Sequence, residues 1–188
     1  MLLSRIYYRL SKCLMSLYGP RMIYYKKNFQ GKKTVNLRIG NTTFIDHPGK
    51  LLIEDHVYIG HHNFIEASNS VTIEKGCQIT SFVSLTSHSS HHSIRLYGSH
   101  YGETNDHIGY QTGEIYIGKF TFIGPHTTIM PGTKIGKGCI VSAYSLLKGE
   151  YPDFSVIAGN PAVVVGSVQE KDQKIIDEHP LLANYYMQ

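Results

Sequence analysis

The chain has 188 residues, enough for one domain with its own hydrophobic core and terminal extensions. Only 17% of the residues are charged and 18 are glycine, which suits a sheet-rich body with tight corners better than a helical bundle. The formal net charge is +4, and basic residues concentrate near the N-terminus. This distribution argues against a nucleic-acid groove running through the domain, so we expect no nucleic-acid partner.

Residues 2–18 predict an amphipathic helix that ends before Gly19-Pro20. Its apolar face comprises Leu3, Ile6, Tyr7, Leu10, Leu14, Leu17 and Tyr18. Arg5, Arg9 and Lys12 lie off this face and interrupt the apolar stretch, so we predict neither a transmembrane span nor a secretion signal. Residues 1–34 form a predicted N-terminal helical segment. Within it, residues 1–28 could contact anionic lipid or simply be solvated.

The cysteines are too few and too scattered for a disulfide framework. This indicates a reducing compartment. We expect a cytoplasmic protein, with peripheral attachment at the inner face of the cell membrane as an extension of that expectation.

A six-residue repeat dominates the centre of the chain. Apolar residues recur every six positions at Ile117, Ile123, Ile129, Ile135, Val141 and Leu147. Small residues follow four positions later at Thr121, Thr127, Thr133, Cys139 and Ser145. This spacing is neither helical nor alternating, and it predicts an all-β solenoid of short strands joined by tight turns.

Glycines directly follow several of the apolar repeat residues. They are Gly40, Gly60, Gly118, Gly124 and Gly136. At these corners we expect either a positive φ or a close approach of neighbouring backbone.

The order of apolar residue, glycine and small residue resembles the hexapeptide repeat of the left-handed parallel β-helix acyltransferases. The resemblance covers residues 35–166 and implies a left-handed parallel β-helix in that range, working as a homotrimer. Residues 167–188 carry helix formers around Pro180 and predict a tail of short helices.

The repeat stops after Leu85 and resumes at Ile115, which predicts an extruded loop over residues 86–114. A long interruption of a regular solenoid is usually functional. Sugar O-acetyltransferases resembling the galactoside and maltose enzymes place their catalytic base at the start of this loop, after a threonine two residues earlier. Thr86 and His88 have that spacing here. The resemblance therefore implies that His88 is the general base, a task that suits neutral imidazole. The alternatives are that His91 or His92 is the base, or that the histidine of this loop has a purely structural role.

Further candidates surround this base. Candidate acceptor contacts are His91, His92, Asn63, Glu66 and Tyr97. Glu66 could also orient His88, although a solvated surface carboxylate is the stronger expectation.

The segment from Ser155 to Ala162 closely matches the signature that ends the family's β-helix. The resemblance implies a groove between subunits for acetyl-coenzyme A, lined by Phe122, Gly124, Ser142, Ala143, Lys148, Ala158, Asn160 and Pro161. Phe122 replaces the usual tryptophan, and Lys148 sits one place earlier than the family's lysine.

The resemblance implies an acetyl-coenzyme A-dependent O-acetyltransferase that acts on a sugar hydroxyl in surface-polysaccharide or lipopolysaccharide biosynthesis, a context to which the predicted N-terminal amphipathic helix also points. N-acetylation of an amino sugar or nucleotide-amino sugar is the nearest alternative. A non-catalytic solenoid that binds a ligand is a third hypothesis. A zinc hydratase resembling the γ-class carbonic anhydrases would need converging histidines such as His88, His91 and His92, and we expect no metal.

Overall fold

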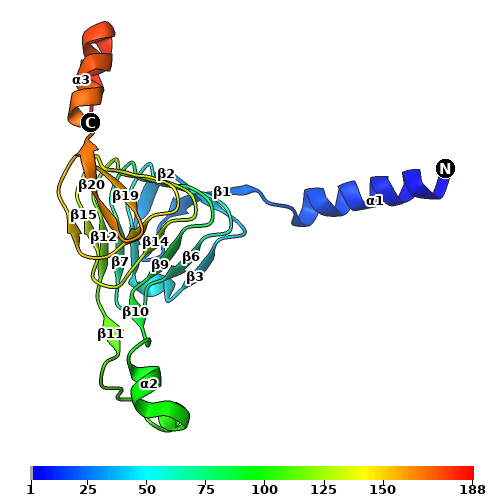
Figure 1. Cartoon of the computed structure of the whole chain (residues 1–188). Coiled ribbons are helices and arrows are strands. Elements are labelled where there is room, and N and C mark those ends of the chain that lie inside the picture. The colour runs from blue at the N-terminus through cyan, green and yellow to red at the C-terminus, as the bar shows by residue number, and fades with distance from the viewer. Residues whose placement is uncertain (1) are drawn as a thin grey trace.

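The computed structural model describes residues 2–188, except for the side chains of residues 2, 3 and 17. Short parallel strands wind into a three-sided coil, which Figure 1 shows in a view along the coil. The chain passes from the first sheet to the second, then to the third, and then returns to the first. Successive turns of the coil therefore stack strand on strand, and residues far apart in sequence become neighbours.

The first sheet comprises β1 (Met22–Lys27), β2 (Lys33–Gly40), β5 (Tyr58–Ile59), β8 (Gln78–Ile79), β13 (Phe122–Ile123), β16 (Ile140–Val141), β19 (Ser155–Gly159) and β20 (Ala162–Ser167). The second comprises β3 (Phe44–Asp46), β6 (Phe64–Glu66), β9 (Ser84–Thr86), β14 (Thr128–Ile129) and β17 (Leu146–Leu147). The third comprises β4 (Leu51–Ile53), β7 (Val71–Ile73), β12 (Ile115–Ile117), β15 (Lys134–Ile135) and β18 (Glu150–Tyr151).

The six-residue repeat fills the interior of the coil. All six apolar repeat residues from Ile117 to Leu147 are 0% exposed. Complete burial of one such side chain contributes about 1.5–3 kcal/mol. The small residues are also buried, and their hydroxyls satisfy corner carbonyls: Thr121 Oγ1 donates to Gly136 O at 2.9 Å. The prediction of an interior built from one large and one small residue per side is confirmed.

The repeat glycines serve close backbone approach rather than a positive φ. A Cβ built on Gly118 would lie 2.6 Å from Lys137 N, and one on Gly124 would lie 2.6 Å from Ala143 N. Neither glycine has a positive φ, so of the two alternatives expected for these corners the close backbone approach is confirmed. Left-handed backbone is found at other positions, which include aromatic residues such as Phe82 and Tyr144 and glycines such as Gly132.

Replacement of Gly118 by alanine should lower stability by about 1–3 kcal/mol, because the new methyl group meets backbone atoms of the next turn. Urea unfolding of the purified protein measures this change. Gly49→Ala is the matched control, since a Cβ there meets nothing within 4 Å. Equal stability of the two variants would contradict close packing between turns.

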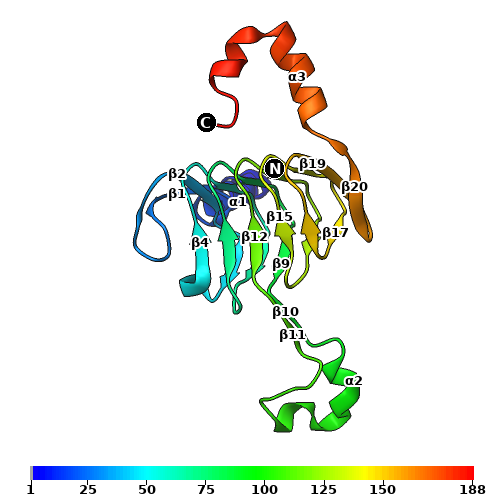
Figure 2. The same ribbon diagram turned by 90° about the vertical axis from the view of Figure 1, so that its left-hand side faces the viewer.

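Helices lie outside the coil at both ends of the chain. Helix α1 (Leu2–Tyr18) extends away from the coil, and the predicted face residues Leu3 and Leu17 lie outside the described side chains. The expected helical segment 1–34 is helical only over α1, because β1 and β2 form an antiparallel hairpin on the first sheet. At the other end, α3 (Gln169–Glu178) and the 3₁₀ helix η3 (Pro180–Asn184) rise from the coil in Figure 2.

The excursion over residues 86–114 leaves the coil between the second and third sheets (Figure 2). Two short antiparallel strands form its neck, β10 (His88–Ser89) and β11 (Gln111–Thr112). Beyond the neck lie α2 (Ser93–Tyr97) and the 3₁₀ helix η2 (Gly98–Glu103). A short 3₁₀ helix, η1 (Pro48–Lys50), occupies the same corner two turns earlier.

Candidate active site

Glu66 lies at the end of β6, in register with Asp46 on one side and Thr86 on the other. Its residue exposure is 2%, so the expectation of a solvated surface carboxylate was wrong. The carboxylate is held by donors from both directions: Ser68 N donates to Oε1 at 2.6 Å, and Ser87 Oγ donates to Oε2 at 2.9 Å. Ser87 N also donates to Oε2, at 3.0 Å.

These donors decide the charge of Glu66. Burial alone raises the pKa of the carboxyl, but hydrogen bonds from Ser68 and Ser87 and the nearby His88 outweigh it and lower the pKa to about 2. Glu66 is therefore an anion at neutral pH. A buried anion in this position is available to hold a cationic or hydrogen-donating partner.

That partner is His88, the first residue of the neck of the excursion. His88 Nδ1 lies 2.7 Å from Glu66 Oε2 and 3.2 Å from Ser68 Oγ. Because an ionised carboxylate can only accept, Nδ1 carries a hydrogen, and in the neutral form of the ring Nε2 carries the lone pair. The His88 side chain is 35% exposed, so solvent or a ligand can reach it. The arrangement gives an oriented imidazole that can take a proton at Nε2.

The excursion folds back onto this imidazole through Tyr110. The rings of His88 and Tyr110 stack at 5.4 Å and 17°. Desolvation, followed by the charges of Tyr101 and Glu66, raises the pKa of Tyr110, so its hydroxyl stays protonated. Sequence analysis missed Tyr110 because 22 residues separate it from His88, and the loop alone brings the two together.

The predicted acceptor residues do not all gather here. His91 and His92 are exposed just beyond the neck, with ring centroids 4.1 Å apart. Partial desolvation, followed by electrostatic repulsion from the side chains of His92, Lys148 and Arg95, lowers the pKa of His91.

The other two acceptor candidates are held within the fold. Asn63 is 2% exposed and its Oδ1 accepts from Val83 N at 2.7 Å, so it serves as a corner residue. The Tyr97 hydroxyl accepts from Ile108 N at 2.9 Å within the excursion.

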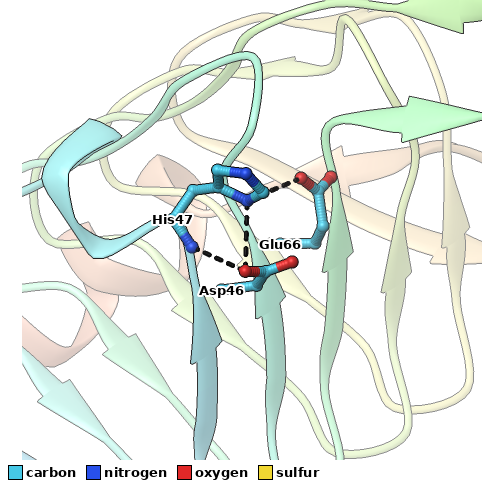
Figure 3. Close-up of side chains that lie close together, drawn as sticks. All are labelled: Asp46, His47 and Glu66. Carbon is cyan, nitrogen blue, oxygen red and sulfur yellow. Dashed lines mark hydrogen bonds and ion pairs between the residues drawn. The ribbon is translucent and has the colours of Figure 1, made fainter. Parts of the chain in front are cut away.

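Asp46, His47 and Glu66 lie close enough to share one ion (Figure 3). Hydrogen bonds already account for this cluster. Asp46 Oδ1 accepts from His47 N at 2.9 Å and lies 3.1 Å from His47 Nδ1, while Glu66 Oε1 accepts from Ser68. Within residues 2–188 the cluster does not include His88, His91 or His92, so the converging histidines of a zinc hydratase are not found there.

Most of the residues predicted to bind acetyl-coenzyme A, the acetyl donor, lie at one corner of the coil, between the first and second sheets. This corner is called the donor corner below. Gly124, Ser142 and Ala143 directly follow β13 and β16, and Ala158 to Pro161 close the same corner at the last turn. Two candidates lie elsewhere. Phe122 projects from the first sheet and is 38% exposed, whereas Lys148 lies at the corner that carries His88. Within one chain, His88 and the donor corner therefore lie at opposite ends of the strands of the second sheet.

A row of stacked rings runs along the donor corner, and sequence analysis missed it. His62, Phe82, His126 and Tyr144 stack in succession at 5.1, 4.9 and 4.8 Å. An aromatic residue at the same corner position of successive turns was the available signal. Phe82 and Tyr144 are 51% and 71% exposed, so the edge of the row faces solvent.

Comparison with known proteins agrees with the repeat and the fold. Residues 114–149 match the family model described as bacterial transferase hexapeptide (six repeats). The chain carries the hexapeptide transferase repeat. The predicted resemblance to the hexapeptide-repeat acyltransferases is thus confirmed, and the matched range begins where the excursion rejoins the coil.

Two curated relatives of this protein come from Escherichia coli. WbbJ of strain K12, provisionally named a lipopolysaccharide biosynthesis O-acetyl transferase, is 31% identical over 62% of this chain and 60% of its own length. A dTDP-4-amino-4,6-dideoxy-D-glucose acyltransferase is 27% identical over 76% of each chain. The match to WbbJ thus spans less than two thirds of that protein.

Solved structures share the fold of this protein. A variant of AntD, an N-acyltransferase from Bacillus cereus, in complex with dTDP and coenzyme A, superposes with a TM-score of 0.63 at 19% identity, covering 82% of this chain and 96% of that one. A maltose O-acetyltransferase from Clostridium difficile 630 gives a TM-score of 0.59 at 17% identity, covering 72% and 66%. At these identities the likeness concerns the fold alone.

Proposed function

We propose that this protein is an acetyl-coenzyme A-dependent O-acetyltransferase that acts on a sugar hydroxyl in bacterial surface-polysaccharide or lipopolysaccharide biosynthesis. The observation that carries the proposal is the 2.7 Å contact between His88 Nδ1 and the buried anion Glu66. It produces the tautomer that a general base requires. The left hand of the coil, implied by the resemblance, belongs to the same proposal.

The proposed reaction is a direct acetyl transfer with His88 as general base. His88 Nε2 takes the proton of the acceptor hydroxyl as its oxygen attacks the thioester carbon of acetyl-coenzyme A. The resulting tetrahedral oxyanion collapses, the carbon–sulfur bond breaks, and the leaving thiolate receives the proton from the imidazolium. Glu66 stabilises the transient imidazolium and holds the ring in place. No covalent enzyme intermediate is required, because the thioester is already activated.

We propose a homotrimer as the working unit. The predicted donor corner and His88 lie at opposite ends of the strands of the second sheet. A groove between two copies would bring the donor corner of one copy to His88 of the other. Light scattering on the purified chain should give three times the mass of the 21.2 kDa monomer. A monomer that nevertheless transfers acetyl groups would contradict a shared site.

Free-thiol release from acetyl-coenzyme A in the presence of sugars, amino sugars and nucleotide-sugars tests the proposed reaction. Release that depends on a hydroxyl acceptor would support O-acetylation. N-acetylation is the second candidate, favoured by the similarity to the acyltransferase that is named for an amino sugar nucleotide. Release with amino acceptors alone would establish that alternative. Absence of coenzyme A binding would leave the non-catalytic solenoid.

The stack of Tyr110 on His88 predicts a smaller kinetic effect. Tyr110→Ala should lower kcat/KM roughly 2- to 10-fold, because an aromatic pair contributes about 0.5–1.5 kcal/mol. Tyr110→Phe is the matched control, since it keeps the ring and removes only the hydroxyl. If Phe and Ala reduce kcat/KM equally, the hydroxyl rather than the stack is the important group.

A further inference from the structure

The charges of this protein are separated along the chain. Residues 1–45 contain nine Lys and Arg residues and no Asp or Glu, whereas residues 46–188 contain nine Lys and Arg and all 14 acidic residues. The first part therefore carries a formal charge of +9, and the rest carries −5. A net charge of only +4 conceals this separation. The N-terminal quarter is a local attractor for anions.

Helix α1 presents an apolar face beside its cations. Ile6, Leu10 and Leu14 lie on one side and are 47%, 59% and 55% exposed. Figure 1 shows the helix extending away from the coil, so the coil does not cover this face. Arg5, Arg9 and Lys12 recur three or four positions apart and occupy the opposite side. The helix is amphipathic, and its apolar face is open to solvent.

The junction that follows the C-terminal end of α1 is held to the coil by Asn41. Asn41, at the corner after β2, accepts from Arg21 N at 2.8 Å and donates to Gly19 O at 3.2 Å. The strand that follows, β1, exposes Tyr24 (69%) together with Lys26 and Lys27. Cations and aromatic side chains therefore continue from the helix onto the edge of the first sheet. A surface that bound α1 would hold the coil close beside it.

We infer that α1 and β1 bind the surface of an anionic lipid bilayer, with α1 lying in the plane of the interface. A nucleic acid would engage the cations and leave the apolar face exposed. A second copy of α1 would bring together two segments that contain cations and no carboxylate. An anionic bilayer accommodates both the apolar face and the cations of α1. The apolar face enters the boundary of the acyl chains, while the cations meet the headgroups. Within the described residues no helix has the length and apolarity to cross a membrane, and α1 has 17 residues.

Co-sedimentation of the full chain with vesicles tests this inference, and the result does not depend on acyl transfer. We expect binding to vesicles of phosphatidylcholine with about 30% phosphatidylglycerol at 0.15 M salt, and weak binding to phosphatidylcholine alone. The triple variant Arg5→Gln, Arg9→Gln, Lys12→Gln should weaken binding on the order of 100-fold, since each cation near such a surface contributes about 1 kcal/mol. Leu10→Gln with Leu14→Gln should also weaken it strongly.

Matched substitutions on the exposed helix α3 serve as the control. Lys171→Gln, Lys174→Gln and Ile175→Gln remove two cations and one exposed apolar side chain and should leave vesicle binding unchanged. Equal binding to neutral and anionic vesicles would overturn the inference. So would α1 variants that bind like wild type, or variants whose loss of binding accompanies a fall in oligomer mass, which would make α1 a contact between copies. Binding to RNA that needs the cations but not Leu10 and Leu14 would assign the segment to nucleic acid instead.

Discussion

His88→Ala should lower kcat for acetyl transfer by roughly 100- to 10,000-fold, the usual contribution of a positioned general base. The alanine variant has no group that can take the acceptor proton. The variant should still bind coenzyme A, because the predicted donor corner lies at the other end of the strands of the second sheet. Thiol release and a coenzyme A binding isotherm, measured on the same preparation, separate the two effects.

His100→Ala is the matched control for this experiment. His100 also lies in the excursion, but its side chain is 73% exposed and pairs with the neighbouring Glu103. Its replacement should leave kcat within about twofold of wild type, as is usual for an exposed surface residue. A His88→Ala enzyme with wild-type turnover would remove His88 from the mechanism and direct attention to His91 and His92.

Glu66→Gln should lower kcat roughly 100- to 1,000-fold while leaving the KM for acetyl-coenzyme A nearly unchanged. Glutamine keeps the size of the side chain, but its amide group can donate a hydrogen bond to His88 Nδ1. The hydrogen of His88 then moves to Nε2, and the ring loses its basic nitrogen on the reactive side. Asp46→Asn is the control, because Asp46 occupies the adjacent register position and contacts His47 instead of His88. Equal effects of both substitutions would indicate a general electrostatic role.

The same variant predicts how stability changes with pH. The pKa of Glu66 is about 2 in the folded protein, below its ordinary value of 4.5, so ionised Glu66 stabilises the fold above about pH 4.5. That contribution, about 3 kcal/mol, is lost as the pH falls from 4.5 towards 2. The difference in urea-unfolding free energy between wild type and Glu66→Gln should therefore narrow on acidification. A difference that stays constant with pH would contradict the lowered pKa.

The coil could be predicted from the sequence because one physical requirement repeats in each turn. Ile123 and Ile129 must fill the interior, and Thr127 must fit a corner, so the spacing of residue types records the geometry directly. The helix at residues 2–18 was predictable for the same reason, since its apolar period is local. The β1–β2 hairpin was not predicted, because Tyr24 and Lys26 are exposed and the strand has no buried stripe.

The candidate site was predictable only in part. His88 followed from a local motif next to an interruption of the repeat. The burial of Glu66 depends on donors from Ser68 and from Ser87 in the next turn, and no local pattern encodes that contact. The stack with Tyr110 depends on the path of the whole excursion. Contacts between turns and across loops need three-dimensional information, whereas repeat positions do not.

The neck of the excursion makes the loop a replaceable part. Gly113 N donates to Ser87 O at 3.0 Å, and β10 pairs with β11, so the two ends of the loop are joined before its helices begin. Lengthening a loop whose ends are already joined adds little entropic penalty, about 0.6 kcal/mol for each doubling of length. Evolution or design could therefore exchange residues 90–110 for another sequence while the coil folds as before. Such an exchange would change which acceptor molecule the loop presents to His88.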